Sequence, residues 1–214
     1  MKSLNLSRPH VLMIVGLPGA GKSFFARQFS ETFGAPVVST DRIRYELFDH
    51  PTYNSSETDL ITRLAVYQTE ELFKTNRSFI LEGGCNGRAD RTRVGQAARK
   101  AGYDVSVVWV QTDPATCRAR ALKRNPEKRP DDKYSPSLTE QQFEAFTKRF
   151  TEPVRENHIV ISGKHTYNTQ AKMVLRKLIA AREAKAEAVH RKEAENVRHS
   201  SQRPETRRRG VIIR

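Results

Sequence analysis

The chain has 214 residues, of which 38 are Lys or Arg and 24 are Asp or Glu, giving a formal net charge of +14. That length predicts one domain of ordinary size, or one domain with an extension. The longest apolar run, residues 11–15, is far shorter than the roughly 20 residues of a membrane span. Two cysteines without CxxC spacing and six scattered histidines argue against a disulfide framework and a zinc site. With no apolar signal-peptide core at the N-terminus, we expect a cytoplasmic protein.

Strands and helices alternate along the first 170 residues. Apolar, β-prone runs predict strands at 10–16, 36–40, 78–82, 105–110 and 158–162. Between them, helices are expected at 21–33, 41–48, 57–75, 89–101, 114–124, 138–150 and from 168 onward, and Phe24, Phe25 and Phe29 are expected on one side of the first. This alternation predicts an α/β fold with a five-stranded parallel sheet sandwiched by helices.

The last part of the chain differs in composition. Residues 171–214 carry 13 Lys and Arg against 5 Asp and Glu, so they hold more than half of the net charge. Lys172–Arg198 lacks Gly and Pro and is rich in Ala, Glu, Lys and Arg, which predicts a long helix, broken at His199–Pro204. We expect a domain over residues 1–170 and a basic, helical and partly disordered extension over 171–214. The extension is either a solvated tail or a contact for nucleic acid or another polyanion.

A phosphate-binding loop follows the first predicted strand. Residues 16–23 read GLPGAGKS and match GxxxxGK[ST] completely, with an apolar strand before and a helix after. Backbone N–H groups of such a loop, and the positive end of the following helix, face phosphate oxygens. The Lys of the motif adds a positive charge for the β and γ phosphates, and the Ser hydroxyl ligates magnesium. The predicted nucleotide-binding residues are Gly16, Pro18, Gly19, Ala20, Gly21, Lys22 and Ser23.

Motifs that the sequence lacks exclude several classes of nucleotide-binding protein. It has no [NT]KxD guanine-reading motif and no LSGGQ-like segment of a transporter ATPase, and it is short for a ring-forming motor. A small kinase that uses ATP and Mg²⁺ remains.

Two acids come at the ends of predicted strands that open on the same crevice. Asp41 can accept the proton of an attacking hydroxyl, and the alternative is a helix N-cap for residues 42–48. Arg44, one turn later, is expected to hold an anionic acceptor. Glu82 ends the strand FILE and is expected to reach magnesium directly or through water; the alternative is a carboxylate covered by a salt bridge.

Further residues are expected to complete the site. Asn86 and Arg88 follow the third strand and are expected to touch the acceptor. Arg120 and Arg124, spaced i,i+4, are expected on one face of a helix, bringing positive charge to the transferred phosphate; the alternative is a solvated basic face.

Two loops are also expected to take part. The polar segment Asn125–Ser137 that follows Arg124 has three prolines and is predicted to be a mobile lid. The loop after the fifth strand, with His165, is expected to meet the adenine base.

The segments GLPGAGKS, STDRIRYELF, ILEGGCNGRADR and CRARALKRN together resemble small P-loop kinases grouped with the kinase domain of phage polynucleotide kinase. Zeta-toxin-type and gluconate-type kinases are more distant relatives, and the resemblance covers roughly residues 10–170. It implies a P-loop NTPase fold like that of nucleoside monophosphate kinases. Lys22 and Ser23 would bind ATP and magnesium, Asp41 would be the base, Arg44 would bind the acceptor, and Arg120 or Arg124 would be lid arginines. Many relatives have Asp where Glu82 stands, and the longer acid can shift metal contact to a bridging water.

The sequence thus predicts an ATP- and Mg²⁺-dependent kinase that transfers the γ-phosphate to a hydroxyl. The acceptor is a nucleic-acid 5′ end, a nucleoside or a sugar, and the basic tail favours the first. The alternative is an ATP-binding, slowly hydrolysing regulatory module that acts through the tail. We expect a monomer that does not bind membranes.

Overall fold

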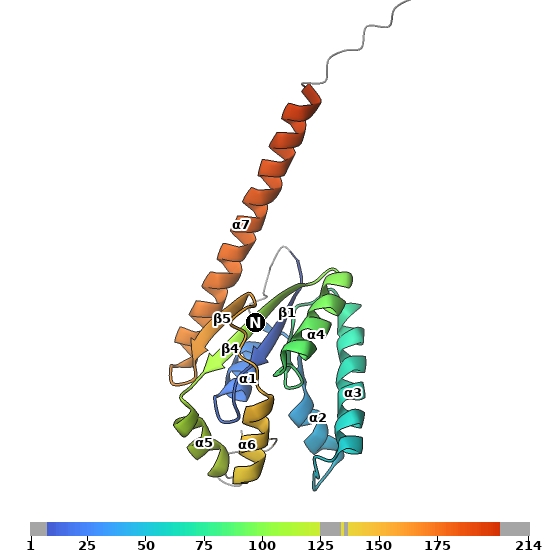
Figure 1. Ribbon diagram of the computed structural model, residues 1–214. Coiled ribbons are helices and arrows are strands. Elements are labelled where there is room, and N and C mark those ends of the chain that lie inside the picture. Colours follow the sequence, from blue (N-terminus) through green and yellow to red (C-terminus); the bar gives the residue numbers. More distant parts are fainter. Residues whose placement is uncertain (1–7, 125–133, 135–136, 202–214) are drawn as a thin grey trace, which may run out of the picture. The chain divides into compact units, whose positions relative to one another are not determined.

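A single parallel sheet organises the chain, as described by a computed structural model for residues 8–124, 134 and 137–201. The strands lie in the order β2-β3-β1-β4-β5 (Figure 1). They are β1 (His10–Val15), β2 (Val37–Ser39), β3 (Phe79–Glu82), β4 (Asp104–Gln111) and β5 (His158–Ser162). The predicted class, a five-stranded parallel sheet between helices, is confirmed, and each of the five strands was predicted within a few residues.

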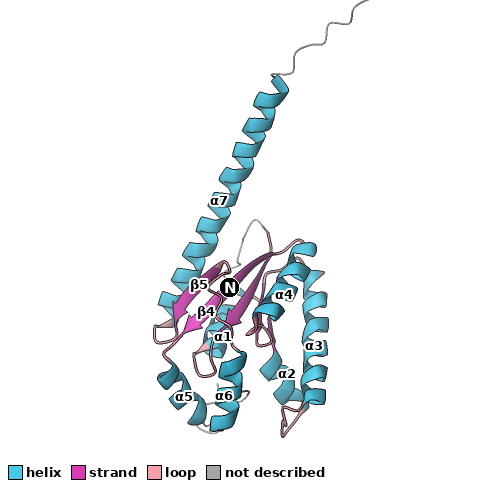
Figure 2. Ribbon diagram, viewed as in Figure 1, coloured by secondary structure: helices cyan, strands magenta, loops and turns pink. Residues whose placement is uncertain are grey.

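Helices connect successive strands and flank the sheet (Figure 2). They are α1 (Lys22–Phe33), α2 (Thr40–Leu47), α3 (Ser55–Phe73), α4 (Arg88–Lys100), α5 (Pro114–Leu122), α6 (Glu140–Arg149) and α7 (Tyr167–Ser201). The predicted break over His199–Pro204 starts too early, because α7 continues through His199 to Ser201; the rest of that segment lies outside the described residues. Most other boundaries differ from the predicted ones by a few residues, because caps rather than apolar patterns fix helix ends.

The central strand explains the order of the sheet. All six residues of β1 are buried, and β1 pairs with β3 on one side and with β4 on the other. One face of the sheet buries Val11, Met13 and Val15 against residues of α3 and α4. Because side chains alternate along a strand, Leu12 and Ile14 point to the opposite face. A strand buried on both faces is the reason for the continuous apolar run at this position.

The opposite face is covered by α1 and the beginning of α7. Phe25 and Phe29 of α1 are buried, and the ring of Phe25 lies 6.3 Å from that of Tyr167, centroid to centroid. The expectation that Phe24 shares this side is wrong, since Phe24 is 45% exposed. The third ring of the stack is Phe33, 4.5 Å from Phe29, because residues four apart share a helix face and adjacent residues do not.

The chain divides into two compact units, Met1–Lys177 and Leu178–Arg214. The predicted division into a domain over residues 1–170 and an extension over 171–214 stays a prediction. Among the described residues no helix is both long and apolar enough to cross a membrane.

Candidate active site

The ends of β1, β2 and β3 bring the predicted site residues together. From β1 the chain first forms β2 and β3, which lie on one side of β1 in the sheet. It then crosses to the other side of β1, where it forms β4 and β5. Such a reversal opens a crevice at the carboxyl ends of the strands, where ligands bind in open α/β sheets. The phosphate-binding loop follows β1, Asp41 follows β2 and Glu82 ends β3, so all three belong to this crevice.

The loop from Gly16 to Gly21 is held open by glycine backbone conformations. Gly16, Gly19 and Gly21 have φ angles of +145°, +80° and +106°, which side chains rarely adopt. A Cβ atom on Gly19 would lie 2.2 Å from the Cys117 carbonyl oxygen of α5, so the loop packs directly on backbone. The curled loop leaves N–H groups available for phosphate oxygens.

Lys22 lies at the first position of α1, where its ammonium group donates to the Leu17 carbonyl oxygen at 3.0 Å. The Lys22 side chain is only partly exposed. Burial lowers the pKa of Lys22, and the negative charges of Glu82 and Asp41 oppose that shift. The ammonium group therefore shares one crevice with both acids.

Glu82 is buried, and two serine hydroxyls hold its carboxylate. Ser23 donates to one oxygen, and Ser39 donates to the other at 3.0 Å. These partners are hydroxyl groups, so the alternative of a salt-bridged carboxylate does not describe Glu82. Burial raises its pKa, as does the charge of Asp41, while Ser23, Lys22 and Ser39 lower it.

The oxygens of Ser23 and Glu82 fit a magnesium ion. Mg²⁺ prefers oxygen ligands, keeps several waters, and in nucleotide sites takes one or two protein ligands besides phosphate oxygens. Among the described residues no group of three or more His, Cys, Asp or Glu gathers to hold a metal by itself. A site of this kind therefore depends on the nucleotide for its remaining ligands.

Asp41 lies in the first turn of α2, and it does not cap the helix. The N-cap is Ser39, whose hydroxyl accepts from the Arg42 N–H at 3.3 Å, so the capping alternative for Asp41 is wrong. Asp41 is exposed, yet the surrounding protein removes enough water from its carboxyl to raise the pKa. The positive charges of Lys22, Arg124 and Arg44 oppose that rise.

Arg44 is 6% exposed, and it pairs with Glu57 of α3. Its guanidinium lies over the Tyr53 ring, 4.4 Å from the ring centroid, and its Nε has no hydrogen-bond partner among the described residues. Tyr53 also contacts the Tyr45 hydroxyl, at 2.9 Å, and the edge of Phe146. The sequence analysis identified Arg44 but not Glu57 or the tyrosines, because only the fold brings residues 44, 53 and 57 together.

The loop after β3 is held by a buried arginine that the sequence analysis also missed. Arg91 of α4 donates to the carbonyl oxygens of Asn86 and Thr151, each at 2.8 Å, and pairs with Glu156. These contacts fix the backbone at Asn86, a predicted acceptor residue. Arg88, the other one, is exposed at the first position of α4.

The two lid arginines do not share a helix face as predicted. The helix α5 ends at Leu122, so Arg120 lies on the helix and Arg124 lies beyond it. Arg124 is nevertheless near Lys22 and Asp41, because its charge acts on both. Arg120 donates to the Gly163 carbonyl oxygen at 3.3 Å. The predicted lid lies largely outside the described residues.

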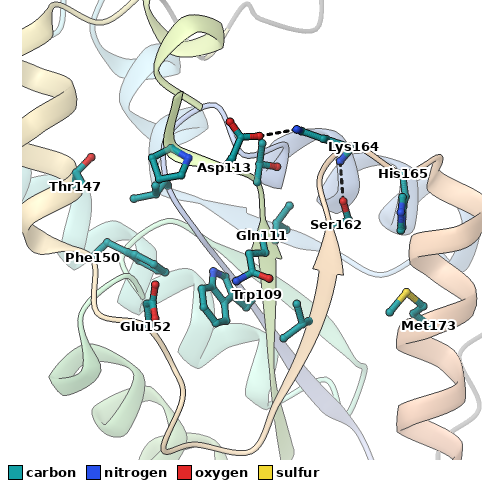
Figure 3. Close-up of a pocket in the computed structure, with 15 residues that line it drawn as sticks. Trp109, Gln111, Asp113, Thr147, Phe150, Glu152, Ser162, Lys164, His165 and Met173 are labelled. Atoms are coloured by element: carbon teal, nitrogen blue, oxygen red, sulfur yellow. Dashed lines mark hydrogen bonds and ion pairs between the residues drawn. The ribbon is translucent and has the colours of Figure 1, made fainter. Parts of the chain in front are cut away.

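The loop after β5 packs against the phosphate-binding loop. A Cβ atom on Gly163 would lie 1.9 Å from the Ala20 carbonyl oxygen and 2.3 Å from the Thr112 hydroxyl. Next to this contact, a pocket of about 790 Å³ is lined by residues that include Trp109, Phe150 and His165 (Figure 3). His165 is exposed at the rim, where an ion pair joins Lys164 to Asp113 at 2.6 Å.

Substituting Gly163 with alanine is expected to weaken nucleotide binding. The added methyl group must displace Ala20 of the phosphate-binding loop, and misplacements of about 1 Å can cost 10²-fold in enzyme sites. We expect a loss of nucleotide affinity of about 10-fold or more, measured by calorimetric titration. The matched control is Gly95→Ala, since Gly95, like Gly163, has no left-handed φ, and the added Cβ meets only the flexible Arg99 side chain, at 3.4 Å. Equal affinities for both variants would contradict a role for the Gly163 contact.

The sequence pattern of a family described as AAA domain (AAA_33) matches residues 11–153. The chain belongs to the AAA_33 family. A shikimate kinase from Symbiobacterium thermophilum is 26% identical over 130 residues, which cover 56% of this chain and 67% of that protein. The AAA_33 match places the phosphate-binding loop, Asp41, Glu82 and Arg124 inside the family's sequence pattern.

Solved structures share the fold of this AAA_33 protein. Kti12 from Chaetomium thermophilum, in complex with ADP-AlF3, has a TM-score of 0.60 at 20% identity and covers 80% of this chain and 98% of its own. A gluconokinase from Sinorhizobium meliloti has a TM-score of 0.56 at 13% identity, with coverages of 83% and 96%. The APS kinase CysC of Mycobacterium tuberculosis, with AMPPNP and APS, has a TM-score of 0.56 at 18% identity, with coverages of 81% and 98%.

These structures confirm the P-loop kinase fold, and the protein similar in sequence is a kinase by name. The bound ADP-AlF3 and AMPPNP of two of the structures support nucleotide binding by this fold. The finer part of the resemblance, to polynucleotide kinases, stays a prediction.

Proposed function

We propose that the protein is an ATP- and Mg²⁺-dependent kinase that transfers the γ-phosphate to a hydroxyl group of its acceptor. The observation that carries this proposal is the crevice that unites Lys22, Glu82 and Asp41 at the strand ends. A phosphate-binding loop alone would serve a hydrolase or a switch equally well. Transfer to a hydroxyl group also needs a general base. Asp41 can serve as that base because it is exposed and does not cap α2.

The residues take complementary parts in this mechanism. The loop from Gly16 to Gly21 binds the phosphates through backbone N–H groups, and Lys22 places a positive charge beside the transferred group. Asp41 accepts the proton of the acceptor hydroxyl as that oxygen attacks phosphorus. Arg120 and Arg124 belong to the nucleotide side, where Arg124 is close enough for its charge to act on Lys22 and Asp41. We assign His165, at the rim beside Lys164, to the base of ATP.

Ser23 and Glu82 are the residues that would hold magnesium, and the ion would neutralise charge on the β and γ phosphates. The Ser23 hydroxyl donates to Glu82, which keeps the carboxylate in place. A direct or water-bridged contact from Glu82 is compatible with this arrangement.

The acceptor side consists of Arg44, Asn86 and Arg88. The names of the relatives, shikimate kinase, gluconokinase and APS kinase, support a small-molecule acceptor. The basic tail supports a nucleic-acid acceptor instead, through the five arginines among residues 202–214. We propose in addition that the protein acts as a cytoplasmic monomer.

A transfer assay with γ-labelled ATP tests the proposal. The purified protein is incubated with oligonucleotides, nucleosides, sugars and sugar acids, with and without Mg²⁺, and label on each acceptor is measured. We expect one class to acquire label in an Mg²⁺-dependent way. Release of labelled phosphate alone, with no acceptor labelled, would favour a hydrolysing regulatory module instead.

The tail can be separated from the transfer reaction by truncation. Deleting residues 199–214 removes five arginines and one glutamate, and we expect turnover on a small acceptor to be unchanged. If the tail contacts nucleic acid, truncation lowers affinity for single strands and flattens the salt dependence, by about 0.7 in log–log slope per lost phosphate contact. Affinities for an oligonucleotide at two salt concentrations decide between these results. Identical affinities and slopes for both proteins would exclude the tail from nucleic-acid binding.

A further inference from the structure

We propose that Glu57 neutralises Arg44 and so selects an acceptor without negative charge, of the sugar or nucleoside class, rather than a carboxylate or phosphate. This inference rests on the proposed function and refines its acceptor side. It concerns only the part of the acceptor that lies against Arg44, since the γ-phosphate is handled by the phosphate-binding loop. Glu57 is therefore a specificity-determining and positioning residue, not a catalytic one.

The first observation is how completely Glu57 is held. One carboxylate oxygen accepts from Arg44, and the other accepts from the Thr52 N–H and the Thr52 hydroxyl, each at 2.7 Å, and from the Tyr53 N–H at 3.2 Å. Burial works against ionisation, but the hydrogen bonds from Thr52, Arg44 and Tyr53 lower the pKa of Glu57 to about 2. Glu57 is therefore a carboxylate at every pH at which a kinase works.

The position of Glu57 is also fixed from the backbone, independently of Arg44. Asn54 caps α3 and accepts from the Glu57 N–H at 2.8 Å, so Glu57 lies in the first turn of the helix. A negative charge is favourable at a helix N-terminus. Apart from Arg44, the Glu57 carboxylate thus accepts three hydrogen bonds and lies at a helix N-terminus. It would therefore stay in place if Arg44 turned toward a ligand.

The second observation is how little of Arg44 is available to an anion. The side chains of Arg44 and Glu57 are 7% and 5% exposed, so the two charges cancel largely out of reach of water. The Tyr53 ring covers the guanidinium, and its hydroxyl contacts that of Tyr45. An anionic acceptor would have to draw Arg44 away from a carboxylate that stays in place through its other three donors, whereas an uncharged hydroxyl compound would not.

The third observation is the chemistry that lies near Asp41 instead. Burial raises the pKa of the Tyr45 and Tyr53 hydroxyls, and the negative charge of Asp41 adds to both rises. Their mutual hydrogen bond raises the pKa of Tyr53 further and lowers that of Tyr45. These rings and hydroxyls, with the Phe146 ring centroid 6.2 Å from that of Tyr53, form an aromatic, hydrogen-bonding surface. Such a surface suits a sugar or a nucleoside, which combine apolar faces with hydroxyl groups.

Sulfate binding tests the inference without knowledge of the acceptor. A non-hydrolysable ATP analogue and Mg²⁺ first occupy the phosphate-binding loop, and sulfate is then titrated while the unfolding midpoint is followed. We expect Glu57→Gln to gain at least about 10-fold in apparent sulfate affinity, since it leaves Arg44 uncompensated beside a site for an anion. The control Glu71→Gln, an exposed acid of the same helix paired with Lys74, should leave sulfate affinity unchanged.

The double variant Arg44→Met with Glu57→Gln keeps the test valid if Glu57→Gln alone fails to fold, because it replaces both partners of the buried pair. The wild type and the double variant should respond equally to sulfate. A weaker response of the double variant would mean that Arg44 already binds anions, and it would overturn the inference, as would a Glu57→Gln protein that folds but gains no affinity.

Acceptor selectivity gives a second readout. Label transfer is compared for matched neutral and anionic acceptors, namely glucose with gluconate and a nucleoside with its 3′-monophosphate. The wild type should prefer the neutral member, and Glu57→Gln should shift the ratio toward the anionic one by about 10-fold. A wild-type preference for the anionic member would overturn the inference and leave the kinase standing. Transfer to neither member would count against the proposed function, and the sulfate titration would still decide the role of Glu57.

Discussion

Replacing Lys22 with alanine is expected to lower phosphate transfer by roughly 10²–10³-fold, the scale for removing one preorganised donor from a developing negative charge. The ammonium group lies at the start of α1 and donates to the Leu17 carbonyl oxygen. Its charge also offsets those of Glu82 and Asp41. The variant therefore loses a phosphate contact, and the Glu82 and Asp41 carboxylates lose the positive charge that offsets theirs.

The measurement is label transfer together with nucleotide affinity, in a protein shown to be folded by its unfolding midpoint. We expect both to fall while the midpoint changes little, because a charge that burial disfavours is removed along with its contacts. Lys100→Ala, which removes an exposed lysine of α4, is the matched control and should retain both. Unchanged affinity and turnover in Lys22→Ala would contradict the assignment of the loop.

The sheet and the nucleotide side of the site could be predicted from sequence because their signals are local. The run from His10 to Val15 is apolar since both faces of β1 are buried, and the loop motif between a strand and a helix is contiguous. Asp41 and Glu82 were identified because strand ends of a parallel sheet open on one edge. Each of these inferences needed only the spacing of residues near one another in the chain.

The acceptor side could not be predicted in the same way because its contacts join distant segments. Arg44 meets Glu57 and Tyr53 across a turn whose course depends on Tyr53 at φ 58°, a conformation that non-glycine residues rarely adopt. Arg91 reaches Thr151, 60 positions away, and no local pattern distinguishes it from the other arginines of α4. The mistaken capping role for Asp41 has a similar origin, because Ser39, Thr40 and Asp41 are all good caps and only the backbone path selects Ser39.

Replacing Asp41 with asparagine is expected to lower turnover by roughly 10²–10⁴-fold, with nucleotide affinity little changed, as for the loss of a general base. Asparagine keeps the shape of the side chain but cannot accept a proton. Since Ser39 caps α2, the substitution leaves the helix start intact. Exposed Asp49, just beyond α2, provides the control Asp49→Asn, which should retain turnover and stability.

Stability should move the opposite way to turnover in Asp41→Asn, and the pKa of Asp41 gives the sign. Its pKa is raised in the folded protein, mainly because the surrounding protein removes water from the carboxyl, against the charges of Lys22, Arg124 and Arg44. An acid whose pKa is raised by folding contributes stability only while it is protonated, and that contribution is lost as pH rises through the folded-state pKa. At neutral pH the ionised carboxylate therefore costs folding free energy, and Asn removes that cost. We expect an unfolding midpoint equal to or above that of the wild type at pH 7, with the difference disappearing below the ordinary carboxyl range.

In the wild type, transfer should rise with pH through the raised pKa, because only the carboxylate accepts the proton. A variant that transfers phosphate at near-normal rates, or that loses stability at neutral pH, would show that Asp41 is a structural residue, and the base would have to be sought elsewhere in the crevice.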